Sequence, residues 1–189
     1  MAVASNYNNY PAQPPPARAT VRQFALAVHQ GDGVPAACVL LQDRFDLDVN
    51  VLLLAAYAGA VRGQTLTPDS VEAVRAVTEP WQAEVVRPLR AVRRRLKSGP
   101  APAPDPRTDE VRSTIAKAEL HAELIELDEL DRWVDDLTTP AAPGEATERA
   151  AAAMDVVVRA HCPGSLKDEE SLALAAIATA ASHHREVGQ

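Results

Sequence analysis

The sequence predicts an all-α fold, an irregular helical bundle of five or six core helices with a helical C-terminal extension. The hydrophobic class makes up 47% of the 189 residues, whereas aromatic residues make up only 4%. Alanine, the strongest helix former, supplies much of that class, and strands favour aromatic and β-branched residues instead. Apolar residues also recur at helical spacing in successive segments that Gly or Pro separates. Together these observations favour helices throughout the folded part.

The first helices are predicted from their end signals. One is expected to begin at Thr20 and to end at the turn of residues 31–33, which holds two glycines. The next is expected over 35–45, with a proline in its first turn. Asp48 is the expected N-cap of the most apolar segment, residues 49–61, because its carboxylate can accept a backbone N–H of the first turn. That segment is predicted to be the central, mostly buried helix.

Prolines mark the boundaries of the next segments. Thr67 precedes a proline and an acid, which together predict a helix over 67–78. Pro80 is expected to open a further helix that runs to Lys97 and bends at Pro88, since an internal proline removes a hydrogen bond. A Pro-rich linker over 98–106 follows.

The second half of the chain predicts three more helices. A long amphipathic helix is expected over 109–137, and two Ala-rich helices over 145–161 and 167–186. Ser165 and Asp168 have the spacing of a capping box before the last one.

These segments define four parts of the chain. Residues 1–19 are rich in proline and polar residues and are predicted to be a disordered arm. Residues 20–137 are predicted to be the bundle domain, 138–144 a linker, and 145–189 a C-terminal helical extension whose docking the sequence leaves open.

Charge and cysteine content narrow the functional classes. The net charge of -7 argues against a general nucleic-acid binder, which usually carries a basic surplus. Cys38 lies in an apolar helical pattern and is expected to be a small core residue, and nothing indicates a disulfide scaffold with Cys162. The N-terminus lacks the pattern of a signal peptide, and no apolar stretch approaches the ~20 residues that span a bilayer. We therefore expect a cytoplasmic protein that does not enter the membrane.

Three segments resemble a known family. The first two are Val34-Pro-Ala-Ala-Cys-Val-Leu-Leu-Gln-Asp-Arg44 and the Asp48-Val-Asn50 sequence before a Leu-rich helix. The third is Trp81-Gln-Ala-Glu-Val-Val-Arg-Pro-Leu-Arg90 with its arginine-rich continuation. They are similar to the pattern of a family of short bacterial proteins that is catalogued as a domain of unknown function. The resemblance covers about residues 20–137. The chain departs from the pattern at Tyr57, where the family usually has Trp. The resemblance implies an all-α fold and no particular activity.

The polar residues at the start of the central helix are the candidate site. Capping by Asp48, with Asn50 bonding the backbone of a neighbouring loop, is one interpretation of them. The other is a small polar pocket to which Gln42 and Asp43 contribute. Because an acid, an amide and arginines near aromatic rings suit a small anion or carboxylate, the ligand-pocket candidates are Asp48, Asn50, Tyr57, Trp81, Arg87 and Arg90.

The arginine-rich segment is expected to form ion pairs within the molecule. Its basic residues are Arg87, Arg90, Arg93, Arg94, Arg95 and Lys97. The following helix is correspondingly acidic, with Glu119, Glu123, Glu126, Asp128, Glu129, Asp131, Asp135 and Asp136. The linker between the two lets them lie side by side, so that opposite charges flank an apolar seam.

No motif in the chain predicts catalysis, a metal site or a cofactor. His121 does not share a helical face with both of its acidic neighbours, and the other histidines lack ligand spacing. There is no Gly-rich phosphate loop and no nucleophile elbow. We therefore expect no catalytic residues, no metal and no cofactor.

Three functions remain open. The leading one is a protein–protein interaction or adaptor module that binds another protein, based on the acidic helix faces and the Ala-rich amphipathic helices. The alternative is an enzyme or a binder of a small anionic ligand at the candidate pocket. A weaker alternative is a nucleic-acid-binding regulator that uses residues 93–97. The sequence does not indicate an oligomeric state.

Overall fold

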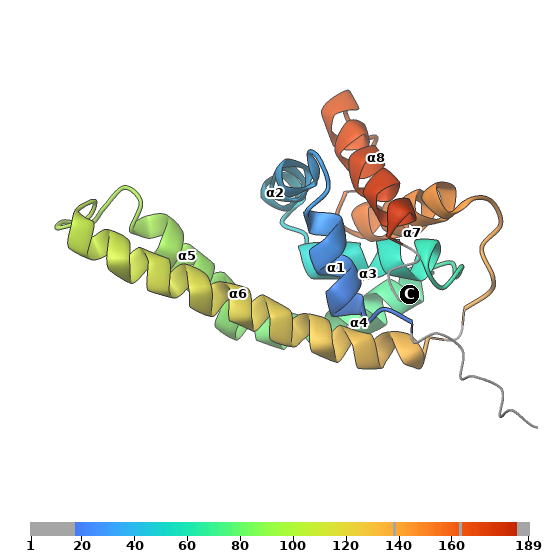
Figure 1. Cartoon of the computed structure of the whole chain (residues 1–189), viewed down its shortest axis with the longest axis horizontal. Coiled ribbons are helices and arrows are strands. Elements are labelled where there is room, and N and C mark those ends of the chain that lie inside the picture. Colours follow the sequence, from blue (N-terminus) through green and yellow to red (C-terminus); the bar gives the residue numbers. More distant parts are fainter. Residues whose placement is uncertain (1–17, 138, 163, 185–189) are drawn as a thin grey trace, which may run out of the picture.

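The computed structural model describes residues 18–137, 139–162 and 164–184, and in these ranges the chain is helical with no β-strand (Figure 1). The helices are α1 (Val21–His29), α2 (Val34–Phe45), α3 (Val49–Ala60), α4 (Pro68–Trp81), α5 (Arg87–Arg95), α6 (Pro106–Asp135), α7 (Ala146–His161) and α8 (Asp168–His183), and a π-helical segment (Gln82–Val86) separates α4 from α5. The predicted all-α bundle is confirmed. Residues 1–17 of the predicted N-terminal arm lie outside the described residues, and Ala19 at its end is buried.

Helix α3 lies at the centre of the bundle because its sequence offers no polar face. Every residue from Asn50 to Ala60 is buried. Helices α1, α6, α7 and α8 all pack against it. Asp48 is the N-cap, and its Oδ1 accepts the backbone N–H of Asn50 at 2.8 Å. The predictions of a central buried helix and of its cap are both confirmed.

The two C-terminal helices share the same core. Helix α7 packs along α3 and crosses it at Gly59, where an added Cβ would lie 2.4 Å from the carbonyl oxygen of Arg149. Helix α8 packs on α2 and α7 and contributes fully buried side chains such as Ile177. The sequence left the docking of this C-terminal segment open. In the structure it completes the shell around α3.

The linker between α6 and α7 is held by the loop that precedes α4. The backbone N–H of Thr65 donates to the carbonyl oxygen of Pro140 at 3.1 Å, and that of Ala142 donates to Gly63 at 2.8 Å. The Gln64 side chain adds a bond from Nε2 to the carbonyl oxygen of Leu137 at 2.9 Å. These bonds fix the path by which α7 returns to α3.

The segment from Pro68 to Arg95 is one helical run with a π-helical turn, which corrects the predicted boundary between Thr78 and Pro80. Pro80 lies inside α4. The interruption expected at Pro88 takes the form of the π-helical turn just before it, where the backbone N–H of Arg87 donates to Gln82. Because Pro88 has no N–H to give to the previous turn, a locally wider turn costs little there.

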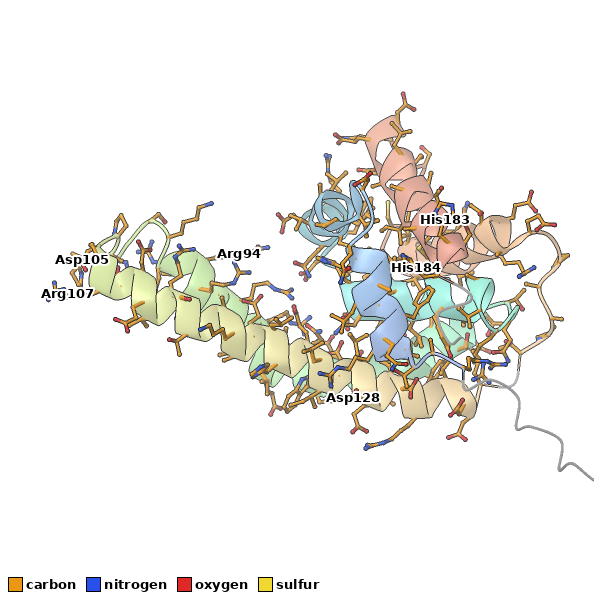
Figure 2. All side chains as sticks on the ribbon, viewed as in Figure 1. Arg94, Asp105, Arg107, Asp128, His183 and His184 are labelled. Carbon is orange, nitrogen blue, oxygen red and sulfur yellow. The ribbon has the colours of Figure 1, made fainter. Side chains whose placement is uncertain are left out.

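Helices α5 and α6 form an antiparallel hairpin that projects from the bundle (Figure 1). Asp105 and Arg107 lie at its far end, and Arg94 lies on α5 (Figure 2). No residue of α5 is buried, and the first buried residue of α6 is Glu119. The outer part of this hairpin, hereafter the hairpin arm, therefore depends on half-buried contacts and ion pairs.

Two further observations concern helix ends and membranes. The predicted capping box at Ser165 is wrong, because Glu170 instead reaches back to the backbone N–H of Lys167, the N-cap of α8, at 2.8 Å. Among the described residues, no single helix is long and apolar enough to cross a bilayer. Helices α1 and α2 reach the required length only together, and they are bent by 104°.

Removing residues 140–189 is expected to abolish cooperative folding of the remainder. The deletion uncovers the face of α3 that α7 and α8 bury. The free-energy cost of exposing its many large apolar side chains exceeds the usual free energy of unfolding of a domain. Circular dichroism during thermal unfolding measures the loss. Leu172→Ser on the exposed face of α8 is the control, and its melting curve should match that of the parent. A truncated chain with a sharp, parent-like transition contradicts the prediction.

Candidate functional site

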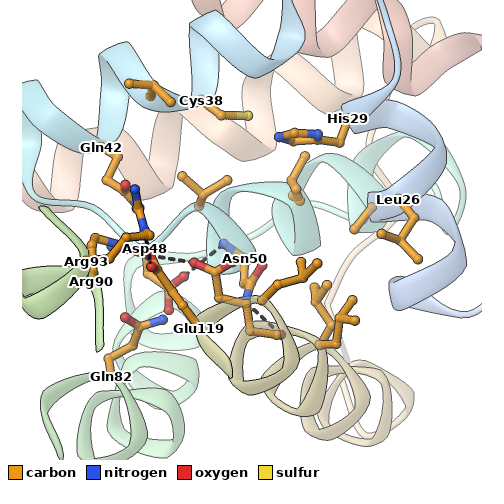
Figure 3. A pocket seen from close by; sticks show the side chains of 18 residues that line it. Leu26, His29, Cys38, Gln42, Asp48, Asn50, Gln82, Arg90, Arg93 and Glu119 are labelled. Carbon is orange, nitrogen blue, oxygen red and sulfur yellow. Dashed lines mark hydrogen bonds and ion pairs between the residues drawn. The ribbon is translucent and has the colours of Figure 1, made fainter. Parts of the chain in front are cut away.

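A buried polar cluster lies where α3, α6 and the π-helical segment meet (Figure 3). Asn50 donates from Nδ2 to the Glu126 Oε1 at 3.0 Å and to the carbonyl oxygen of Glu123 at 3.1 Å. Gln82 donates from Nε2 to the other Glu126 oxygen at 2.8 Å. Two amides thus converge on one carboxyl group from α6. Asn50 bonds a helix of the bundle, whereas the capping interpretation expected a loop.

Asp48 and Glu126 form a carboxyl pair within this cluster. The Oδ2 of Asp48 is buried and accepts no bond from the amides or the backbone, and the Glu126 carboxyl group is hydrogen-bonded to Asp48. Two buried carboxylates in contact cannot both be ionised, so one proton is retained between them. Burial, and next the negative charge of Asp48, raise the pKa of Glu126 to about 9. Burial also raises the pKa of Asp48. At neutral pH the pair therefore keeps one proton between Glu126 and Asp48.

An ion-pair network adjoins the carboxyl pair. Arg90 donates from Nε to Glu119 at 3.0 Å and from Nη2 to Glu123 at 2.6 Å. Arg93 makes two bonds to Glu119, one of them from Nη2 at 3.0 Å. The amide of Gln42, oriented with Oε1 toward Arg90, accepts from Nη1 at 2.9 Å. The side chains of Arg90 and Glu119 are 14% and 6% exposed, so these pairs are shielded from solvent.

The network shifts the titration of its members. Burial acts to raise the pKa of Glu119, but the hydrogen bonds from Arg93 and Arg90 outweigh it and the pKa is lowered. For Glu123 burial prevails over the attraction of Arg90, and the pKa is raised. Burial acts to lower the pKa of Arg90, but its bonds to Glu119 and Glu123 raise it. The hydrogen bond to Glu119 likewise raises the pKa of Arg93, so Arg90 and Arg93 both stay charged.

The expected pairing between the arginine-rich segment and the acidic helix is confirmed. Besides Arg90 and Arg93, Arg94 pairs with Asp43 of α2 at 2.6 Å, and Arg87 pairs with Glu79 of α4. Four of the six basic residues of this segment, among them Arg93 and Arg94, are thus bonded to carboxylates of the same chain.

An open groove lies on one side of the polar cluster. It has a volume of about 290 Å³ between α1, α2, α3 and α6. Leu26, Val39 and Leu120 stand at its rim and are 43%, 55% and 49% exposed. Its apolar wall is formed by Ala25, Cys38, Val49, Leu53, Leu124 and Leu127, and its polar end by Gln42, Asp48, Asn50, Gln82, Arg90, Arg93, Glu119 and Glu123. Figure 3 shows Leu26 and His29 at the end away from the arginines.

A second cavity, of about 260 Å³, lies on the other side and is mostly polar; we call it the polar cavity. Its walls come from the loop before α3, from α4, from the start of α5 and from the end of α7. Asp48, Gln82 and Arg90 line both the groove and the polar cavity. These three side chains therefore form the wall between the two.

The structure brings four of the six candidate residues together. Asp48, Asn50 and Arg90 belong to the cluster, and Arg87 lines the polar cavity.

Tyr57 and Trp81 lie apart from the cluster. Tyr57 lies on α3 two helical turns beyond Asn50. Its hydroxyl donates to the carbonyl oxygen of Ala19 at 2.7 Å, and its ring packs edge-on against Phe24. The indole N–H of Trp81 donates to the carbonyl oxygen of Ala122 at 3.0 Å. Neither lines the groove or the polar cavity.

The sequence did not single out Glu126 or Gln82, although both are central to the cluster. A signal was present for Glu126, because Glu119 and Glu126 are seven residues apart and share a helical face with Ala122 and Leu130, all four of them buried. Glu126 is one of the eight acids of this helix that we expect from the sequence to flank an apolar seam and to pair with the arginine-rich segment. For Gln82, inside the π-helical segment, the sequence carried no signal.

The cysteines lie within the described residues, and neither is in a disulfide. Cys38 is buried, and burial raises the pKa of its thiol to about 11, so it behaves as an apolar core residue, as expected. Cys38 and Cys162 are both free thiols. Across the described ranges, no group of three or more His, Cys, Asp or Glu side chains is arranged to hold a metal ion.

Comparisons with known proteins place the chain in a family without assigning an activity. No curated protein and no solved structure matches it. One family model matches residues 21–130, more than half of the chain and the whole of the polar cluster. The chain belongs to the family described as protein of unknown function (DUF2390).

Proposed function

We propose that this protein is an interaction module that binds an amphipathic helix of a partner protein in the groove. The observation that carries the proposal is the ring of exposed apolar side chains around the mouth of the groove. Leu26, Val39 and Leu120 come from three different helices and yet border one opening. Exposed apolar side chains are ordinary when scattered singly, but a group around a groove is typical of a binding surface.

The shape and lining of the groove suit a helix. Its walls are themselves helices, and side chains at i, i+3, i+4 and i+7 of a partner helix would enter between them. The volume of about 290 Å³ is at the lower limit of the ~300–1,000 Å³ typical of small-molecule sites. Insertion of a few apolar side chains from a longer helix uses such a volume better than a whole cofactor would.

Charge favours a partner helix with a basic flank. From residue 119 to residue 131, α6 carries no lysine or arginine. Glu126 is buried, Glu119 and Glu123 are bonded to Arg90 and Arg93, and the exposed acids of this stretch are Asp128 and Glu129. The two arginines at the polar end of the groove are bonded to Glu119 and Glu123. Few cationic donors are therefore left in the groove for an anion, whereas lysine or arginine beside α6 would meet complementary charge.

Selection of displayed helical peptides tests the proposal. A library with randomised helix faces is selected on the full-length protein and in parallel on Leu120→Glu. We expect peptides enriched only on the parent to carry apolar residues at helical spacing and lysine or arginine at one flank. Leu120→Glu should weaken their affinity at least tenfold, since it places a charge at the mouth of the groove.

Leu172→Glu is the matched control, because Leu172 is 70% exposed on α8 and does not border the groove. It should bind the selected peptides as the parent does. Peptides that bind the parent and Leu120→Glu equally, or a selection that enriches no common pattern, would overturn the proposal.

A further inference from the structure

The polar cavity offers charges of both signs from opposing elements. Arg75 on α4 and Arg87 and Arg90 on α5 supply three guanidinium groups. Two of its three carboxylates, Asp46 and Asp48, come from the loop between α2 and α3; the third, Glu79, lies on α4 and is bonded to Arg87.

Arg75 and Arg87 retain hydrogen-bond donors in this cavity. The carboxylate nearest to Arg75 is Glu72, with 3.9 Å between Nη1 and Oε2, which is too long for a hydrogen bond. Arg87 uses one Nη for Glu79. A guanidinium has five N–H donors in a planar fork, so both side chains can still bind a carboxylate. Arg90, by contrast, is bonded to Glu119 and Glu123 on the groove side.

His161 and Asp46 complete the lining. His161 bonds through Nδ1 to the carbonyl oxygen of Val157 at 3.0 Å, which places the proton of the neutral ring on Nδ1 and leaves Nε2 as an acceptor. Asp46 is exposed at the edge of the cavity, with a left-handed backbone at φ 50° that turns the chain toward α3. The lining of the cavity therefore holds acceptors for a ligand's N–H groups as well as the donors of Arg75 and Arg87.

The balance of charge decides the class of ligand. Three guanidinium groups and three carboxylates line the cavity, so neither a polyanion nor a simple cation is favoured over water and salt. A molecule that carries a positive and a negative charge can pair with a carboxylate and with the guanidinium groups at once. The volume of about 260 Å³ limits it to a small one.

We propose that the polar cavity binds a small zwitterion of the α-amino acid type, whose carboxylate pairs with Arg75 and Arg87 and whose ammonium group faces Asp46. This site is separate from the proposed helix-binding groove and does not depend on it. The two share only the wall of Asp48, Gln82 and Arg90.

Thermal unfolding of the full-length protein with each common α-amino acid, at constant ionic strength and pH, tests the proposal. A ligand at ten times its Kd should raise the Tm by roughly 3 to 6 °C. Acetate and methylammonium, which carry one half of the zwitterion each, should raise it by less than a third of that when used alone or mixed.

Two kinds of variant separate this site from the rest of the molecule. Arg75→Gln combined with Arg87→Gln should abolish the shift, whereas Arg159→Gln, which removes one exposed arginine of α7, should keep it. Leu120→Glu in the groove should also keep it. If the double variant is too unstable to compare, the ring signals of His161 in the nuclear magnetic resonance spectrum of the parent should move on addition of the amino acid.

The proposal is overturned by any of three results. These are no Tm shift with any amino acid, an equal shift with acetate or methylammonium, or an equal shift in the double variant. If the selection yields no helical peptide that binds the groove while an amino acid still shifts the Tm, the proposed function alone is overturned.

Discussion

Gly59→Val is expected to destabilise the protein by at least about 3 kcal/mol, because the side chain has no room where α3 and α7 cross. A Cβ at this position would lie 2.4 Å from the carbonyl oxygen of Arg149 and 2.7 Å from the backbone nitrogen of Ala150. Backbone atoms of a helix cannot turn aside as a side chain can, so the helices must separate. Chemical denaturation followed by circular dichroism measures the loss.

The geometry predicts a graded series at this position. Gly59→Ala should already destabilise the protein, although alanine favours a helix over glycine by about 1 kcal/mol. Separation of the helices would also break the bond from Nε of Arg149 to the Gly59 carbonyl oxygen at 3.0 Å. Ala91→Val on the exposed surface of α5 is the control for β-branching and should cost less than about 1 kcal/mol. A Gly59→Ala variant more stable than the parent would show that the two helices do not meet there.

Stability is expected to fall as the pH rises from about 4.5 to about 9, because the folded protein keeps a proton that the unfolded chain releases. Burial, and next the charge of Asp48, raise the pKa of Glu126 from 4.5 to about 9. Below pH 4.5 both states hold the proton and the contribution of Glu126 is complete. Above it only the folded state does, so the free energy of unfolding decreases by up to about 1.4 kcal/mol per pH unit until the folded pKa is passed.

Glu126→Gln should remove the contribution of Glu126 to this slope, because glutamine has no proton to release. Its Nε2 cannot accept, so one of the two hydrogen bonds from Asn50 and Gln82 is lost. We expect the variant to be about 1–3 kcal/mol less stable than the parent near pH 6, because a buried amide donor is left unpaired, and more stable than the parent at pH 9. Urea unfolding at several values between pH 6 and pH 9 measures both slopes. Glu129→Gln, exposed on the same helix, should leave the slope unchanged. Parallel curves for the parent and Glu126→Gln would show that Glu126 is ionised in the folded state.

The centre of the fold was predictable because α3 carries its own signals. An unbroken apolar segment has no polar face, and Asp48 marks its start, so both burial and cap follow from local physics. The pairing of α5 with α6 was predictable from charge, since basic and acidic segments flank a short Pro-rich turn. Neither inference needed a contact between distant segments to be known.

The composition of the site was less predictable because it depends on such contacts. Tyr57 seemed close to Asn50 in sequence, but seven residues along a helix separate them by about 10 Å. Trp81 is adjacent to Gln82 in sequence, yet adjacent helical residues point about 100° apart, and only Gln82 turns to Glu126. Glu126 could be buried only with Asn50, Gln82 and Asp48 around it. No single segment contains that set.

The π-helical turn at Gln82–Val86 sets the rotational phase of everything after it. A π-helical turn accommodates one residue more than an α-helical turn, and one residue corresponds to about 100° around the axis. Had the run from Pro68 to Arg95 been α-helical throughout, Arg90 and Arg93 would face a different direction from α6 and would miss Glu119. The charges that hold the base of the hairpin arm therefore depend on the wider turn that takes up one extra residue. The same residues wound as α-helix would lose the pairing with every arginine and glutamate still in place.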